Sequence, residues 1–183
     1  MGFSFSGAIG AAIADKNRNV VCMIGDGGFN MNIQELQTVL NYNLSLKTII
    51  LDNRIYGITK AFQETNFYGR SEACGPVGYN PPDFAKIVEA YGIKSMTLEN
   101  SLEGYDAVRK KIREFLDSKE AVVMVVNCKE YHTYEPKIIG WETPIEDMYP
   151  YLDRQELFDN LYIEPLPSSY NPFMPSIFTN NQP

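Results

Sequence analysis

Two short apolar runs, each followed by a polar residue, constrain the fold of this chain more than any other feature. Residues 20–24 lead into a glycine-rich segment that contains Asp26, and residues 48–51 lead to Asn53. The segment between them carries apolar residues at helical spacing. A strand, a turn, a helix and a second strand in this order predict a βαβ unit, whose two strands run parallel.

The polar residues at the ends of these strands predict a binding site for magnesium and a diphosphate. Parallel strands end at the same edge of a sheet, so we expect Asp26 and Asn53 to be neighbours. A carboxylate and an amide oxygen suit Mg²⁺, which takes its other ligands from phosphate and water. Because Gly27 and Gly28 have no side chains, we expect backbone N–H groups at the start of the next helix to point at a phosphate.

Helical and strand-like segments alternate along the first two thirds of the sequence. The expected helices cover residues 3–16, 32–42, 58–64, 82–90 and 102–116, and the expected strands cover residues 20–24, 47–51, 93–98 and 122–126. The last of these strands is almost wholly apolar, as expected of a strand that is buried on both faces. The predicted fold class is α/β, a parallel sheet with helices on both faces.

Composition changes after residue 128, which predicts two domains. Residues 129–183 hold eight of the eleven prolines and six of the twelve tyrosines. We expect an α/β domain over residues 1–128 and an irregular extension over residues 129–183 that wraps a partner subunit. Only a short helix over residues 154–160 is predicted there, and the last fifteen or so residues are expected to be disordered.

Charge and hydropathy exclude some classes of partner. A net charge of -7 and a pI of about 4.8 argue against a nucleic-acid surface. The sequence has neither an apolar run of the roughly 18 residues that a membrane span needs nor a secretory leader. Three scattered cysteines without a CxxC pair are expected to be reduced thiols. We therefore expect a cytoplasmic protein that binds neither nucleic acid nor a membrane.

The site segment resembles the thiamine diphosphate signature, a Gly-Asp-Gly followed by an asparagine near the end of the next strand. Residues 1–12 and 29–36 extend the likeness to the C-terminal cofactor domain of acetolactate synthase large subunits, over about residues 1–128. This resemblance implies thiamine diphosphate and Mg²⁺ as cofactors. It implies that Asp26 and Asn53 hold Mg²⁺ by their side chains and that Ile55 holds it by its backbone carbonyl.

Further roles follow from the same resemblance. The implied cofactor-binding residues are Met1, Gly25, Asp26, Gly27, Gly28, Asn30, Asn53 and Ile55. Met1 stands where the family has the apolar residue that supports the bent cofactor, although it also reads as a simple initiator residue. Ile58 and Phe62 stand on the helix that faces the substrate pocket, or they are core residues of a short helix.

Two departures from the family pattern bear on specificity. Asp52 replaces the first of two adjacent asparagines and adds a carboxylate beside the predicted ligand. Phe62 replaces a tryptophan that helps acetolactate synthases to choose their second 2-oxo acid. The acceptor substrate therefore stays open.

The resemblance implies a transferase or lyase that decarboxylates pyruvate or a similar 2-oxo acid and transfers the acyl unit to a second carbonyl. The activating glutamate of such enzymes lies on another domain, and no segment here resembles that domain. We therefore expect no catalytic residue in this chain, an inactive isolated chain, and a complementary pyrimidine-binding domain or subunit in a homo- or hetero-oligomer. A flavin (FAD) site would also lie in other domains.

Three readings of the chain stay open. In the first reading, the chain is a fragment of an acetolactate synthase-like carboligase. Met1 favours this reading, because the family has a methionine at this position in mid-chain. Alternatively, it is the cofactor-binding subunit of a split 2-oxo acid decarboxylase. The third reading is a non-catalytic remnant that keeps the fold without turnover.

Overall fold

The computed structural model describes residues 1–99, 104–128, 147 and 152–165. The chain divides into two compact units, Met1–His132 and Thr133–Pro183. The predicted domain boundary adjoins residues 129–146, which lie outside the described part, as do the last residues for which disorder was expected. The location of the boundary therefore stays a prediction.

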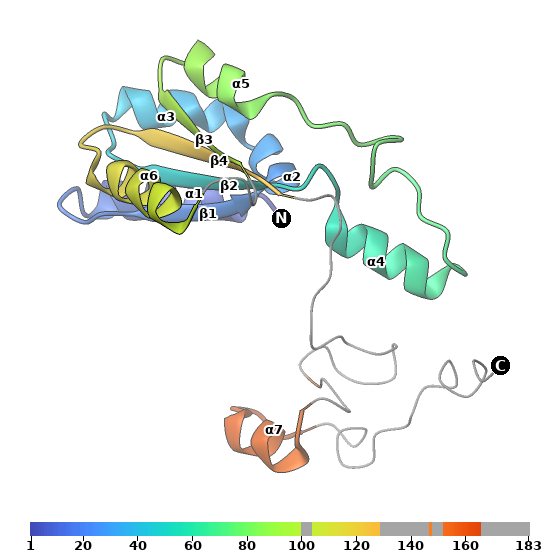
Figure 1. Cartoon of the computed structure of the whole chain (residues 1–183). Coiled ribbons are helices and arrows are strands. Elements are labelled where there is room, and N and C mark those ends of the chain that lie inside the picture. The colour runs from blue at the N-terminus through green and yellow to red at the C-terminus, as the bar shows by residue number, and fades with distance from the viewer. Residues whose placement is uncertain (100–103, 129–146, 148–151, 166–183) are drawn as a thin grey trace. The chain divides into compact units, whose positions relative to one another are not determined.

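A four-stranded parallel sheet forms the centre of the first unit (Figure 1). The strands lie in the order β1-β2-β4-β3, so β1 and β3 are the edges. Their bounds are β1 Val21–Gly25, β2 Lys47–Asp52, β3 Lys94–Glu99 and β4 Val122–Asn127. All pairings are parallel, with Gly25 opposite Leu51 and Asp52 opposite Asn127. The carboxyl ends of the strands therefore meet at one edge of the sheet.

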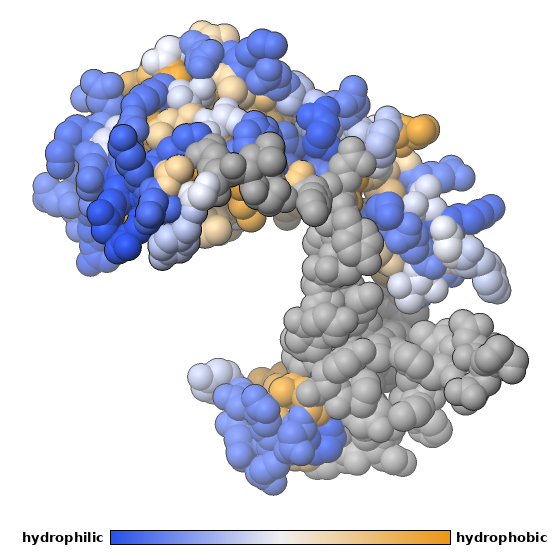
Figure 2. All heavy atoms as spheres, viewed as in Figure 1, coloured by the Kyte–Doolittle hydropathy of each residue, from blue (hydrophilic) through white to orange (hydrophobic). Residues whose placement is uncertain are grey.

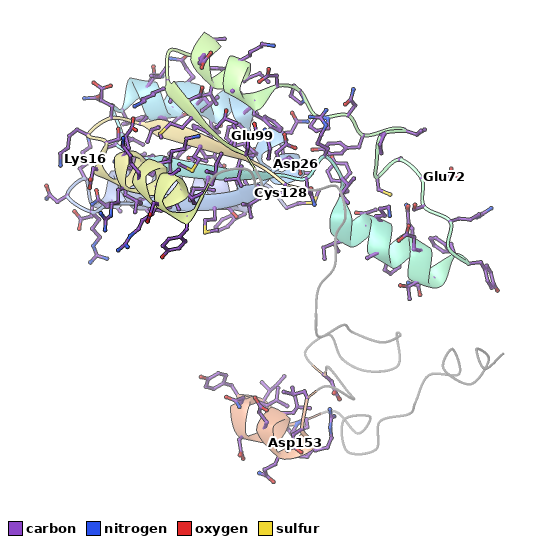
Figure 3. All side chains as sticks on the ribbon, viewed as in Figure 1. Lys16, Asp26, Glu72, Glu99, Cys128 and Asp153 are labelled. Carbon is purple, nitrogen blue, oxygen red and sulfur yellow. The ribbon has the colours of Figure 1, made fainter. Side chains whose placement is uncertain are left out.

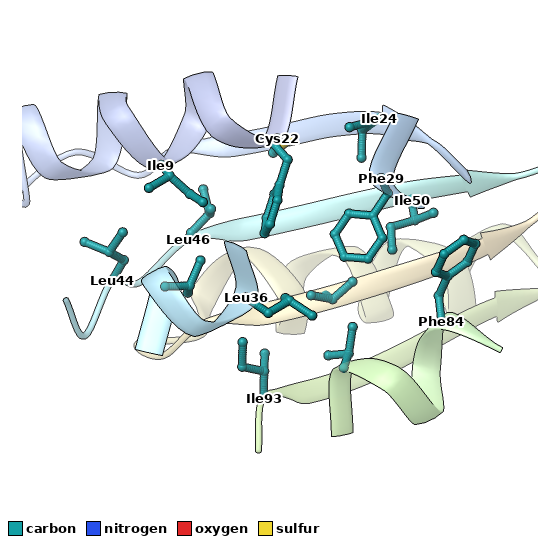
Figure 4. Close-up of a cluster of buried hydrophobic side chains, with 14 of the residues drawn as sticks. Ile9, Cys22, Ile24, Phe29, Leu36, Leu44, Leu46, Ile50, Phe84 and Ile93 are labelled. Atoms are coloured by element: carbon teal, nitrogen blue, oxygen red, sulfur yellow. The ribbon is translucent and has the colours of Figure 1, made fainter. Parts of the chain in front are cut away.

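Helices cover both faces of this sheet, as predicted. Their bounds are α1 Phe3–Ala14, α2 Asp26–Asn30, α3 Leu36–Asn41, α4 Gly57–Asn66, α5 Phe84–Ala90 and α6 Tyr105–Asp117. One face is buried by α1, α2, α3 and α5, whose apolar side chains join those of the strands in one cluster (Figure 4). The other face packs against α6, and the exposed side of α6 is hydrophilic (Figure 2).

Three phenylalanines connect the first layer of helices. Phe29 of α2 makes edge-to-face contacts with Phe5 of α1 and Phe84 of α5, at centroid distances of 5.1 and 5.6 Å. All three side chains are buried. Aromatic edges prefer this geometry to a face-to-face stack. Phe29 therefore fixes the short helix that begins at Asp26 between two longer neighbours.

Strand β4 is buried on both faces, as its apolar sequence predicts. Val123 and Val125 belong to the cluster under α1, α3 and α5, whereas Val122 and Met124 pack with Phe115 of α6. Successive side chains of a strand point to opposite faces, which explains the alternation. The central strand thus links the two apolar layers.

The helix predicted over residues 32–42 is found over residues 33–41, but its first turn is a 3₁₀ helix rather than an α-helix. The segment contains a 3₁₀ helix, η1 Ile33–Glu35, followed by α3, and Leu40 is exposed rather than buried. Asn32 precedes them with φ −135° and ψ 29°, and its side chain donates to the carbonyl of Gly2 at 2.8 Å. Helical structure begins after Asn32, whose own backbone angles are not helical.

The second unit contains α7 Arg154–Asn160, with the bounds that the sequence predicts. Asp153 caps this helix by accepting hydrogen bonds from the backbone of Gln155 and Glu156 at 2.8 and 3.3 Å. Arg154 donates two hydrogen bonds to the buried carboxylate of Asp147, at 2.7 and 2.8 Å. Among the described residues of the chain, no helix combines the length and apolar character that crossing a membrane requires.

Candidate functional site

A cavity of about 530 Å³ opens at the carboxyl edge of β1 and β2. Eight of the residues predicted for the site line it, namely Met1, Gly25, Asp26, Gly27, Gly28, Asn53, Ile55 and Ile58. Asn30 and Phe62 do not line it. Asn30 is exposed at the end of α2, and Phe62 packs against Phe67 on the exposed side of α4, with a centroid distance of 6.2 Å.

Asp26 is the most constrained polar residue of this cavity. Its side chain is only 3% exposed, because Asp26 directly follows β1 and begins α2. Oδ1 accepts a hydrogen bond from the N–H of Gly27 at 2.7 Å, whereas Oδ2 is buried without a hydrogen-bond partner in the described part of the chain. Burial raises the pKa of Asp26 to about 6, and the nearby carboxylate of Asp52 adds to the rise. A carboxylate in this position favours a bound cation.

Asp52 lies beside Asp26, a placement that the sequence alone does not give. It ends β2, is buried, and accepts a hydrogen bond from the N–H of Arg54 at 3.2 Å. The guanidinium of Arg54 lies 3.8 Å from the other carboxylate oxygen. That contact is long and partly exposed, so it compensates little of the negative charge. Two buried carboxylates with one orphaned oxygen fit a site for a divalent cation.

The other predicted metal ligands come from the loop that follows β2. Asn53 and Ile55 both line the cavity, and the amide oxygen of Asn53 accepts a weak 3.4 Å hydrogen bond from the N–H of Ile55. Within the described residues, no group of three or more His, Cys, Asp or Glu side chains is arranged to hold a metal. This suits Mg²⁺, which commonly takes one or two carboxylates from protein and fills its shell with phosphate and water.

Close packing requires glycine at position 27 and leaves little room at position 28, whereas a Cβ atom on Gly25 would meet nothing within 4 Å. A Cβ atom on Gly27 would lie 2.3 Å from Cε1 of Tyr56, and one on Gly28 would lie 3.1 Å from Cγ1 of Ile24. The N–H of Gly27 donates to Asp26 in this structure. The expected contact of these N–H groups with a phosphate stays a prediction.

Met1 at the start of the chain and Ile58 of α4 form an exposed apolar wall of the cavity. The side chains of Met1 and Ile58 are 82% and 64% exposed, and both line the cavity. Gly2 is fixed by the hydrogen bond from Asn32 and has φ +82°, a value that glycine adopts readily. Met1 is thus anchored next to the cavity through its neighbour.

Sequence reasoning missed several residues at the site. Among them, Tyr56 and Cys128 line the cavity, and Tyr79 stacks on Tyr56. Cys128 follows β4, so its position at the carboxyl edge was predictable from the parallel order of the strands (Figure 3). Burial and the charges of Asp52 and Asp26 raise the pKa of its thiol. No sequence signal pointed to Tyr79, because it lies in a loop far from the signature segments.

The fold agrees with the comparison to known protein families. Residues 1–126 match the family described as thiamine pyrophosphate enzyme, C-terminal TPP binding domain. The chain belongs to this family. Its predicted α/β fold and its predicted resemblance are thereby confirmed.

Individual relatives identify the branch of the family that this chain is similar to. It is 42% identical over 112 residues to a probable acetolactate synthase large subunit of Methanococcus aeolicus, covering 61% of this chain and 18% of that protein. It is 34% identical over 142 residues to the acetolactate synthase large subunit of Haemophilus influenzae, covering 76% of this chain and 24% of that protein. The chain thus spans about a fifth of the length of these relatives.

A solved structure also matches. The thiamine diphosphate-dependent 4-hydroxybenzoylformate decarboxylase of Rhodococcus jostii RHA1 superposes with a TM-score of 0.58 and 26% sequence identity. The match covers 72% of this chain and 24% of that chain.

Proposed function

We propose that this chain is the cofactor-binding part of an acetolactate synthase-like carboligase that acts on pyruvate or a similar 2-oxo acid. The observation that carries the proposal is the orphaned, buried Oδ2 of Asp26, which lies in a cavity at the edge where the family's signature residues converge. The similarity to acetolactate synthase large subunits supports the reaction class.

In this proposal Asp26, Asn53 and the carbonyl of Ile55 hold Mg²⁺. Gly25, Gly27, Gly28 and Asn30 surround the diphosphate, and Met1 supports the bent cofactor; all except Asn30 line the cavity. The negative charge of Asp26 and Asp52 attracts the cation, and the buried position of Asp26 strengthens this attraction by excluding water. When bound, thiamine diphosphate supplies the electron-accepting centre that decarboxylation of a 2-oxo acid requires.

No residue of this chain receives a catalytic role. The activating glutamate is expected on a complementary pyrimidine-binding domain or subunit, so the working site is shared in an oligomer. Ile58 lines the cavity and is placed to contact substrate, whereas Phe62 reaches a substrate only if α4 contributes its outer side. On this basis the isolated chain binds the cofactor but does not turn over substrate.

A second candidate is the cofactor-binding subunit of a split 2-oxo acid decarboxylase. The structural match to a thiamine diphosphate-dependent decarboxylase favours it. The third candidate, a non-catalytic remnant, is distinguished by whether any partner chain restores activity. An assay for acyl transfer to a second carbonyl separates the first candidate from the second, and an assay with a partner chain separates both from the third.

Calorimetric titration with thiamine diphosphate, with and without Mg²⁺, tests the proposed site. We expect magnesium-dependent binding that a co-purifying partner tightens. Asp26→Ala should abolish the magnesium dependence, whereas Asp117→Ala should leave it unchanged, because Asp117 is exposed at the end of α6 that lies at the opposite edge of the sheet. Equal affinity of the Asp26 variant and the unsubstituted chain would contradict the site assignment.

A further inference from the structure

The hydroxyl of Tyr79 is a buried polar group near the proposed metal site. The side chain is 6% exposed, and its hydroxyl makes no hydrogen bond to any residue that the structure describes. Oδ2 of Asp26 is in the same condition. Leaving a buried donor and a buried acceptor unpaired costs free energy, so two such atoms at one site call for a functional explanation.

Packing places Tyr79 beside the segment that carries Asp26, because its ring stacks on Tyr56 and the Tyr56 ring lies against Gly27, the residue after Asp26. Burial raises the pKa of Tyr79 above its ordinary value, and the negative charges of Asp26 and Asp52 raise it further. The hydroxyl therefore keeps its proton at neutral pH and acts as a donor. Ionised carboxylates are the strongest acceptors for such a donor.

The ring of Tyr79 is held firmly by its surroundings. It stacks on the ring of Tyr56 with a centroid distance of 3.9 Å and an interplanar angle of 31°, and its N–H donates to the carbonyl of Gly75 at 2.9 Å. Gly78 precedes it with φ +94°, and a Cβ atom there would lie 2.6 Å from Cα of Ala73. Only glycine permits this close turn, which fixes the backbone immediately before Tyr79.

Arg54 connects the residues that follow Tyr79 to the carboxyl edge of the sheet. Its guanidinium donates to the side-chain oxygen of Asn80 at 2.8 Å and to the carbonyl of Pro81 at 3.1 Å, while its backbone N–H donates to Asp52. The residues on both sides of Tyr79 are therefore fixed. Its hydroxyl has little freedom to find another partner.

We propose that Tyr79 is a positioning residue of the metal site, whose hydroxyl donates a hydrogen bond to Oδ2 of Asp26 when the cation is bound. With the N–H of Gly27 on Oδ1, the carboxylate is then oriented from both sides, and its remaining lone pairs face the cation. Partners of this kind that fix a metal ligand change metal affinity by about 10- to 100-fold. The inference rests on the proposed function, because it requires Asp26 to be a metal ligand.

Tyr79→Phe tests the inference, because it removes the hydroxyl and keeps the ring on Tyr56. The full chain, with any co-purifying partner, is titrated with Mg²⁺ at saturating thiamine diphosphate, and its thermal unfolding midpoint is measured without ligand. We expect the half-saturating Mg²⁺ concentration to rise about tenfold. The unligated midpoint should not fall, since the variant removes an unpaired buried hydroxyl. A merely structural role predicts the opposite, a lower midpoint.

Tyr91→Phe is the matched control, because Tyr91 is half-buried at the end of α5, away from the carboxyl edge. It should leave the Mg²⁺ requirement unchanged. If Tyr79→Phe binds like the unsubstituted chain while Asp26→Ala does not bind, or if it loses stability and affinity together, the role of Tyr79 is refuted and the proposed function stands. If the unsubstituted chain shows no magnesium-dependent binding, both are refuted.

Discussion

Asp26 meets two opposing requirements in the ligand-free chain. Its buried position between β1 and α2 disfavours the charged carboxylate, but a cation would need that charge. The second carboxylate at Asp52 increases the conflict, and Arg54 relieves it only in part. The chain thus keeps a locally unfavourable arrangement at the place where ligand binding would remove the penalty.

This conflict predicts how stability depends on pH. The pKa of Asp26 is raised to about 6 in the folded chain from its ordinary 3.8, so the folded state binds the proton more tightly. This contribution is complete below the unfolded pKa and is lost as pH rises to about 6. Asp26→Asn, which carries no charge, should therefore be more stable than the unsubstituted chain above about pH 6, by roughly 1–3 kcal/mol, and gain little near pH 4.

Urea unfolding of the two chains without Mg²⁺ at about pH 4 and about pH 7 measures this difference. Tyr79 and Cys128 face the same carboxylate, and both keep their protons in this range because their pKa values are raised. An equal difference at both pH values would show that Asp26 ionises as freely in the folded chain as in water.

Gly27 is required because it packs against the ring of Tyr56, whereas Gly10 packs against nothing and serves as the matched control. Gly27→Ala would place a Cβ atom 2.3 Å from the Tyr56 ring, so we expect a loss of about 1–3 kcal/mol in the free energy of unfolding. A Cβ atom on Gly10 meets nothing within 4 Å on the exposed side of α1. Gly10→Ala should therefore stabilise the chain by about 0.5–1 kcal/mol. Chemical denaturation of both variants would contradict this account if the two changes had the same sign.

Helix α5 begins at a capping aspartate, Asp83. This cap fixes the end of the loop that contains Tyr79, and Arg54 holds the same loop at Asn80 and Pro81. Asp83 accepts a hydrogen bond from the N–H of Lys86 at 3.2 Å and forms an exposed ion pair with its ammonium at 3.0 Å. Asp83→Ala should lower the free energy of unfolding by about 1 kcal/mol. Asp83→Asn should cost less than about 0.5 kcal/mol, because asparagine caps equally well and exposed pairs contribute little. If urea unfolding ranks the two variants equally, the ion pair rather than the cap stabilises this helix start.

The elements that the sequence predicts best are those whose signal is periodic. The four strands and α7 lie within one or two residues of their expected bounds, because apolar runs and an aspartate cap mark them. The segment after Asp26 differs, because it forms three short helical pieces instead of a turn and one helix. The break between α2 and η1 lies at Met31 and Asn32, and Asn32 donates a tertiary hydrogen bond to Gly2, a contact that local periodicity does not encode.

The site was predictable as far as chain topology determines it. Parallel strands necessarily bring Asp26 and Asn53 to one edge, and the same logic places Cys128 there. The positions of Tyr56 and Tyr79 depend instead on a loop whose path is set by glycine conformation and by Arg54. Such contacts join residues that are distant in sequence and carry no local pattern.

The cavity and both apolar clusters of the sheet lie within residues 1–128, although the chain continues for 55 more residues. The compact units Met1–His132 and Thr133–Pro183 divide close to this point. We therefore expect a chain that ends at residue 132 to fold and to bind thiamine diphosphate with the same magnesium dependence as the full chain. Unfolding and calorimetric titration of the two chains side by side provide the measurement.

The same truncation separates cofactor binding from assembly. If the C-terminal extension wraps a partner subunit, the shortened chain should keep its own affinity for thiamine diphosphate. It should lose the increase in affinity that a co-purifying partner gives. Titration with and without that partner measures both. This outcome requires that the proposed ligands Asp26, Asn53 and Ile55 are held within the sheet unit, where their described hydrogen bonds lie. If truncation instead abolishes binding by the isolated chain, residues 133–183 contribute to the site itself, and the proposed boundary between cofactor domain and extension is wrong.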